Sequence, residues 1–198
     1  MAIFKTELCD GLTDREVVLS SFNDIAYFAC LVIRYETRLL QYIQKISQSS
    51  QEEAEDILQD GFIKIWKNIK AYDTSLTLEN WIFRIIHNET ISYWRKKTSF
   101  AKDHVVDIDN EKIQFLLPTD EVYDFEKDNG YKIIEEILPL LKPEYREVLV
   151  LKFFENKSYE EISDILKIPE GTVATRINRA KKSFRDLSEG KFDQTIFK

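Results

Sequence analysis

Glycine and proline are scarce in this chain of 198 residues, which contains 5 and 4 of them. Turns between strands use these residue types heavily, so the composition disfavours a sheet sandwich and favours long helices with few connections. The 43% of apolar residues and 13% of aromatic residues are enough for packed cores and argue against a disordered chain. The length suits one domain or two small ones.

Long apolar runs and cysteines are also few. No run of eighteen apolar residues occurs, so we expect no membrane insertion. The beginning of the chain, MAIFKTELCDGLTDRE, lacks a basic start followed by an apolar stretch, which predicts no secretory signal and a cytoplasmic location. Cys9 and Cys30 are the two cysteines and have no CxxC spacing. We expect free thiols rather than a disulfide or a metal site.

The charge is unevenly distributed. Residues 103–128 contain nine acids and two bases, which accounts for the whole net charge of −7. A strongly acidic stretch between two neutral parts is typical of a linker rather than a core. We therefore predict domains at 1–98 and 131–198, joined by an acidic linker at 99–130.

Apolar residues recur at gaps of three and four in the first part of the chain, which predicts three amphipathic helices. The predicted helices span Phe22 to Ile46, Glu52 to Lys70 and Leu78 to Lys97, and the first twenty residues are expected to be loosely ordered. Three helices of this length form one bundle. The third mixes Trp81 and Trp94 with a basic end, and exposed aromatic rings beside cations suit unpaired nucleic acid. The alternative is an ordinary core-facing helix with a solvated basic end.

The last third of the chain carries a helix-turn-helix pattern. Ser158 is followed by Glu161 at the spacing of a capping box, which predicts a helix from Tyr159 to Leu166 that Pro169 stops. A second helix begins at Gly171 and carries no acid as far as Arg185. Its first turns suit base edges in the major groove and its later cations suit phosphates. The alternative is a helical hairpin with a solvated basic face.

Together these segments resemble the bacterial RNA polymerase sigma factors of the sigma-70 family, specifically the extracytoplasmic-function type. The region-two motif AED-x-x-Q-x-x-F-x-x-W stands at 54–66. A second pattern follows at 72–97 and consists of YD, a loop, W-I-x-x-I-x-x-N and a basic cluster. In region four, P-E-G-T-V-x-T-R-I-x-R-A-K is intact at 169–181. The resemblance implies an all-α fold: an N-terminal three-to-four-helix bundle and a C-terminal helix-turn-helix bundle.

The resemblance also implies a transcription initiation factor that binds core RNA polymerase, directs it to specific promoters and aids melting of the promoter DNA. It implies three sets of residues: a polymerase-docking face, a minus-ten reading surface and a minus-thirty-five reading helix. The docking face comprises Asp56, Gln59, Asp60 and Ile63. The minus-ten set comprises Asp73, Thr74, Ser75, Thr77, Trp81, Arg84, Asn88, Arg95 and Lys96. The minus-thirty-five set comprises Ser158, Thr172, Thr175, Arg176, Arg179 and Lys182.

Several positions depart from the family pattern. Asn156 and Lys167 stand where glycine is usual; asparagine tolerates a left-handed backbone, whereas lysine there requires strain. Gly61 inside the docking helix costs roughly 1 kcal/mol relative to alanine. Ser92 stands where aspartate is common, so no role passes to it, and the loop sequence DTSLTLENW at 73–81 is atypical.

Other functions remain open at the level of sequence. A stand-alone helix-turn-helix regulator would bind an operator without polymerase, usually as a dimer. An enzyme is disfavoured because His87 and His104 lack ligand spacing and any nucleophile context. We expect no cofactor, no metal and a monomer when free, and the family resemblance implies an inhibitory anti-sigma protein as a further partner.

Overall fold

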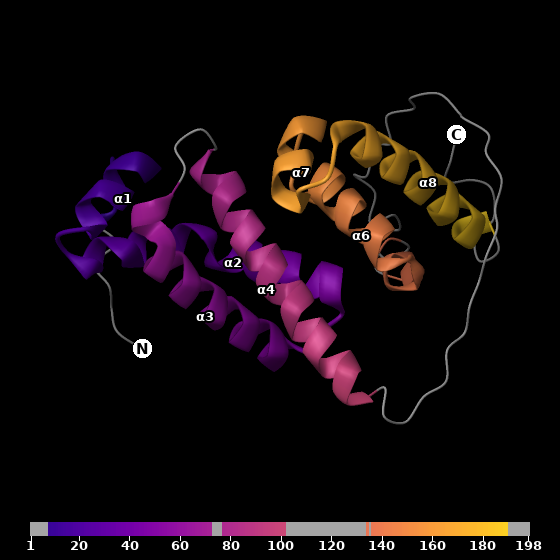
Figure 1. Cartoon of the computed structure of the whole chain (residues 1–198), viewed down its shortest axis with the longest axis horizontal. Helices are drawn as coiled ribbons and strands as arrows, with labels where there is room; N and C mark the ends of the chain where they lie inside the picture. The colour runs from indigo at the N-terminus through magenta and orange to yellow at the C-terminus, as the bar shows by residue number, and fades with distance from the viewer. Residues whose placement is uncertain (1–7, 73–76, 102–133, 135, 190–198) are drawn as a thin grey trace. The chain divides into compact units, whose positions relative to one another are not determined.

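The computed structural model describes residues 8–72, 77–101, 134 and 136–189, and every regular element within them is helical. These helices form two compact units, one with α1 to α4 and one with α6, most of α7, and α8 (Figure 1). The predicted all-α class is confirmed. Most of the predicted acidic linker lies outside the described residues, so its boundaries stay a prediction.

The N-terminal unit is a bundle whose main helices follow the predicted periodicity. Ser50 caps the third helix by a reciprocal capping box with Glu53, and Gln48 ends the second in a left-handed conformation. The elements are α1 (Asp14–Ser21), η2 (Ile25–Tyr27), α2 (Phe28–Ser47), α3 (Gln51–Asn68), η3 (Ile69–Ala71) and α4 (Leu78–Ala101).

The start of this unit corrects two expectations. Thr13 and Glu16 form a capping box that opens α1 within the stretch expected to be loosely ordered. The predicted helix from Phe22 is also wrong, because α2 begins six residues later. The Asp24 side chain accepts a hydrogen bond from the Ala26 N–H and starts η2 separately. Phe22 and Ile25 are consequently 39% and 63% exposed rather than part of a core-facing stripe.

The core of the bundle explains the glycine inside α3. Ile82, Phe83 and Ile86 of α4 are fully buried. A Cβ atom added to Gly61 would lie 2.3 Å from Ile86 Cδ1. Glycine therefore permits α3 and α4 to approach closely, which offsets its low helix propensity.

The C-terminal unit packs short helices around one apolar core. Its elements are η5 (Leu138–Leu140), α6 (Pro143–Leu149), the π-helical turn η6 (Val150–Phe154), α7 (Tyr159–Leu166) and α8 (Glu170–Glu189). Pro143 occupies the first turn of α6, where its missing N–H costs no helical hydrogen bond. The buried Arg146 donates to the carbonyls of Pro139 and Leu141 at 3.2 and 3.0 Å, which ties η5 to α6.

Two residues of this unit adopt left-handed backbone conformations where the family usually has glycine. Asn156 has φ 53° and Lys167 has φ 56°. Lys167 is the C-cap of α7 and its N–H donates to the Ser163 carbonyl. The predicted turn between α7 and α8 is confirmed, and lysine accepts the strain of the left-handed region there.

Candidate nucleic-acid and polymerase interfaces

The predicted docking residues form one exposed stripe along α3. Asp56, Gln59, Asp60 and Ile63 are all exposed, and Ile63 is 43% exposed despite its apolar side chain. Their spacing of three and four residues keeps them on one face, opposite the buried Ile57, Leu58, Phe62 and Ile65. The stripe is thus acidic and polar with one apolar member, and it faces away from the core of the bundle.

Helix α4 is held against the bundle by polar contacts from two neighbouring helices. Arg38 of α2 pairs with Glu79 at 2.6 Å and lies 5.2 Å from the Phe83 ring centroid. Lys64 of α3 forms an ion pair with Glu89. These contacts fix the rotation of α4 about its axis, so its other face is presented in a defined way.

A buried histidine contributes to the same positioning. His87 Nδ1 lies 2.9 Å from the Tyr42 hydroxyl, and both side chains are buried. Burial lowers the pKa of His87 to about 4, so the ring is neutral at pH 7. Sequence reasoning recognised that His87 had no catalytic context but did not reveal this contact between α2 and α4.

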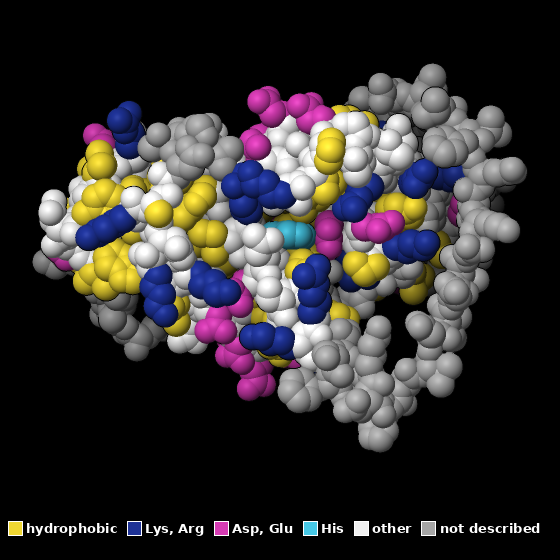
Figure 2. Space-filling view, viewed as in Figure 1, with side chains coloured by type: hydrophobic (Ala, Val, Ile, Leu, Met, Phe, Trp, Pro, Cys, Tyr) yellow, Lys and Arg dark blue, Asp and Glu magenta, His cyan; other side chains and the backbone are white. Residues whose placement is uncertain are grey.

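The predicted minus-ten residues on α4 divide into exposed and buried members. Asn88, Arg95 and Lys96 are exposed, Arg84 is half-buried, and Figure 2 shows Lys and Arg side chains along this helix. Thr77 caps α4: its carbonyl accepts from Trp81 N–H at 3.1 Å. Asp73, Thr74 and Ser75 lie outside the described residues.

Trp81 does not offer the exposed ring that the sequence predicted. Its side chain is 8% exposed, and its ring centroid lies 5.3 Å from that of Tyr72. The expectation of an exposed stacking ring is therefore wrong at this position. The physical reason is that Trp81 and Tyr72 pack together where the chain enters α4, so Trp81 supports the ends of the predicted minus-ten loop.

Helix α8 presents a basic face opposite its core face. Val173, Ile177 and Ala180 are buried, whereas Thr175, Arg179 and Lys182 are exposed. The Thr175 hydroxyl donates to the Gly171 carbonyl at 2.8 Å. The remaining predicted members follow the same side of the turn and helix: Thr172 and Arg176 are half-buried, and Ser158 is the N-cap of α7.

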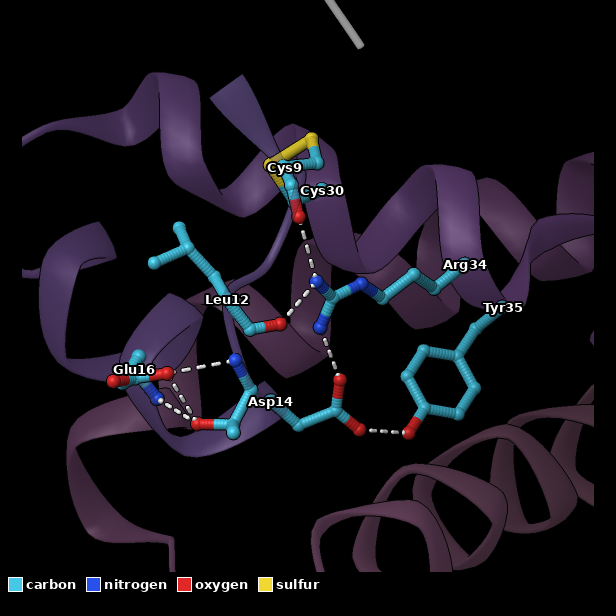
Figure 3. Close-up of polar contacts among 8 residues, drawn as sticks. Cys9, Leu12, Asp14, Glu16, Cys30, Arg34 and Tyr35 are labelled. Carbon is cyan, nitrogen blue, oxygen red and sulfur yellow. Dashed lines mark hydrogen bonds and ion pairs between the residues drawn. A yellow bond between two sulfur atoms is a disulfide. The ribbon is translucent and has the colours of Figure 1, made fainter. Parts of the chain in front are cut away.

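The two cysteines also correct an expectation. Cys9 and Cys30 form a disulfide (Figure 3). They are 21 residues apart in sequence, but their Cα atoms are 5.4 Å apart because the segment before α1 folds back along α2. Arg34 donates to the carbonyls of Cys9 and Leu12 at 3.0 and 2.6 Å.

Sequence reasoning missed this N-terminal cluster altogether. Arg34 pairs with Asp14 at 2.5 Å, and the Tyr35 hydroxyl donates to the same carboxylate (Figure 3). Burial first, and the Asp14 carboxylate second, raise the pKa of Tyr35. The available signal was Thr13–Glu16, which has the same capping-box spacing that identified α7.

Neither a membrane-spanning helix nor a metal site is present in the described ranges. None of their helices is both long and apolar enough to cross a bilayer. No three of their His, Cys, Asp and Glu side chains are grouped so as to hold a metal ion.

The chain thus carries an exposed acidic stripe on α3 of one unit and a helix-turn-helix with a basic second helix in the other, an arrangement of the class of helical transcription factors. The chain belongs to the sigma-70 family: the region 2 model matches residues 31–100 and the region 4 model matches residues 131–184. It is a sigma factor of the extracytoplasmic-function type, and its relatives carry that description.

Two relatives illustrate the similarity. The ECF RNA polymerase sigma factor SigW of Bacillus subtilis is 34% identical over 169 residues, which cover 80% of this chain and 87% of that protein. The ECF RNA polymerase sigma-E factor of Haemophilus influenzae is 25% identical over 191 residues, covering 88% and 95%.

Solved structures share the fold. CnrH, in complex with the cytosolic domain of CnrY, matches with a TM-score of 0.63 at 20% identity and covers 90% of this chain and 99% of CnrH. The sigma factor RpoE of Bartonella quintana, in complex with the anti-sigma factor NepR, matches with a TM-score of 0.60 at 24% identity, covering 83% and 98%.

Proposed function

We propose that this chain docks on core RNA polymerase through the α3 stripe and reads the two promoter elements with α4 and α8. Family membership makes it a transcription initiation factor that binds RNA polymerase and promoter DNA, and not an enzyme. The assignment of each role to particular residues is the proposal. The observation that supports it most strongly is the exposed stripe of Asp56, Gln59, Asp60 and Ile63, which nothing in the bundle requires.

The DNA-facing roles rest on the arrangement of cations. In this proposal the exposed Arg95 and Lys96 of α4 and Arg179 and Lys182 of α8 hold phosphates, whereas the first turns of α8 meet base edges. Trp81 acts by supporting the minus-ten loop rather than by stacking on a base. The logarithm of the promoter-binding constant falls linearly with the logarithm of the salt concentration. Substitution of any one phosphate-binding cation by alanine should reduce the steepness of that line by about one.

Four further aspects follow from the same proposal. The protein acts in the cytoplasm, where its polymerase is found, and it is a monomer when free. An inhibitory anti-sigma protein binds it, by analogy with the solved complex of RpoE with NepR. The predicted domain boundaries at 98 and 130 place the two recognition surfaces on separately folded parts.

The decisive experiment is promoter-dependent run-off transcription with core polymerase, using the wild type and Asp56→Ala/Gln59→Ala. We expect the wild type to direct specific initiation and the double variant to lose at least about tenfold in activity, equivalent to about 1.4 kcal/mol of docking free energy. The matched control is Glu36→Ala/Gln41→Ala, which removes an exposed acid and amide from α2 and should leave activity unchanged.

A second candidate is a stand-alone regulator that uses α8 without polymerase. It would bind one duplex tightly by itself and add nothing to core polymerase in transcription. That result would overturn the docking role of the α3 stripe.

A further inference from the structure

The N-terminal segment from Cys9 to Cys30 stands apart from the matched family regions. It precedes residue 31, where the region 2 match begins, and it is covalently closed on α2 by the disulfide. It contains α1, η2 and the exposed apolar side chains of Leu19, Phe22 and Ile25. Family resemblance therefore assigns it no role.

A small set of contacts holds this segment on α2. Helix α1 has eight residues, too few to be stable alone in water. Val17 and Val18 are its buried apolar side chains, and Asp14 bonds to Arg34 and Tyr35 (Figure 3). With so small an apolar contact, the disulfide is a large part of what keeps α1 docked.

The two cysteine residues differ in exposure. Cys30 is fully buried, whereas Cys9 is partly exposed. An attacking thiolate can therefore reach Cys9 Sγ, and Cys30 leaves as a thiolate that takes up a proton. The second thiol of a dithiol reductant then releases Cys9. In total the protein disulfide gains two electrons and two protons, and the dithiol becomes a disulfide.

The compartment makes this chemistry relevant. In a reducing cytoplasm, disulfides of ordinary proteins are mostly transient or redox-sensing rather than permanent. A disulfide in a protein that works with cytoplasmic polymerase is therefore expected to be reduced and re-formed as the ratio of reduced to oxidised thiols in the cell changes.

Helix α1 also adjoins the predicted minus-ten site. A cavity of about 770 Å³ lies between α1 and the residues that flank the 73–76 loop. Val18, Leu19 and Phe22 line it from the α1 side, and Tyr72, Thr77 and Leu78 line it from the other. If α1 undocks, the cavity loses this wall and opens to solvent beside Tyr72, Thr77 and Leu78.

We propose that Cys9–Cys30 is a thiol–disulfide switch: the closed disulfide keeps α1 docked on α2 as one wall of the cavity beside Tyr72, Thr77 and Leu78 and favours promoter opening, and reduction releases α1. This inference rests on the proposed sigma-factor function. It makes promoter opening depend on the redox state of a disulfide that precedes the region 2 match in the chain.

The test compares oxidised and dithiothreitol-reduced full-length protein by amide hydrogen exchange and by run-off transcription with core polymerase. On reduction we expect α1 amides to exchange about tenfold faster or more, and transcript yield to fall by roughly threefold or more. Cys9→Ser should match the reduced wild type with and without the reductant, which controls for effects of the reductant on polymerase. Asp14→Asn, with the disulfide intact, should loosen α1 partially.

The outcomes separate the two proposals. Equal α1 exchange in both redox states overturns the switch. Faster exchange with unchanged transcription overturns its link to promoter opening. Absence of promoter-dependent transcripts in both states refutes the proposed function instead, and the exchange measurement still decides whether the disulfide controls α1.

Discussion

At the scale of single residues, burial decides the protonation state of His87. Its ring lies between α2 and α4, close to the Tyr42 hydroxyl, and desolvation there disfavours the charged form. The cost of keeping the ring neutral depends on pH, because the unfolded chain can protonate it at its ordinary pKa of 6.5.

This gives a pH prediction with a defined sign. Because the folded-state pKa is lowered to about 4, the unfolded chain binds more protons between about pH 6.5 and 4. Stability should therefore be unaffected by this group above pH 6.5 and fall by roughly 3 kcal/mol as the pH drops to 4. Urea unfolding of wild type and His87→Gln at pH 7.5 and 4 measures the difference. Parallel losses in both proteins would contradict it.

At the scale of elements, the close packing of α3 against α4 favours glycine at position 61, although glycine has a low helix propensity. Gly61 was identifiable from sequence only as a weak point in a helix. The structure shows that its missing Cβ leaves room for Ile86, a fully buried side chain.

Gly61→Ala should consequently destabilise the bundle although alanine is the better helix former. We expect a gain of about 1 kcal/mol in helix propensity to be outweighed by overpacking of about 1–3 kcal/mol. The control is Gly171→Ala, where nothing lies within 4 Å of the added Cβ and stability should not fall. Chemical denaturation of both variants decides, and a Gly61→Ala protein at least as stable as wild type would show that Ile86 can move aside.

At the scale of the whole molecule, we expect the distribution of charge to lower the affinity of the free protein for DNA. The acidic stretch at 103–128 carries the entire net charge of −7 between two otherwise neutral parts. A net negative charge weakens non-specific binding to phosphates, so the free protein should have low affinity for DNA.

Replacing the nine acids of this stretch with Ser and Asn should raise non-specific DNA binding by the free protein severalfold, with a strong dependence on salt. Fluorescence anisotropy with a random duplex at two salt concentrations measures it. The matched control is Asn110→Ser in the same stretch, which leaves the charge unchanged. Unaltered affinity in the acid-free variant would mean that the acids serve only solubility.

The sequence by itself determined the helical class, the helix-turn-helix and the shared, exposed face of the α3 stripe. These follow from local rules: the 3.6-residue period fixes which side chains share a face, and capping residues fix where helices begin. That is why Tyr159–Leu166 was predicted to the residue and why Asp56, Gln59 and Asp60 lie together.

Only the tertiary structure decided which of the remaining side chains meet. The Cys9–Cys30 disulfide, the Tyr42–His87 contact and the packing of Trp81 on Tyr72 each join residues by chain folding rather than by helical period. Periodicity cannot distinguish an aromatic ring that faces solvent from one that closes a turn, and sequence separation does not encode distance across a bundle. The burial of Trp81 and the closed disulfide were therefore beyond local pattern, because both depend on how the segments before α2 and α4 pack against the bundle.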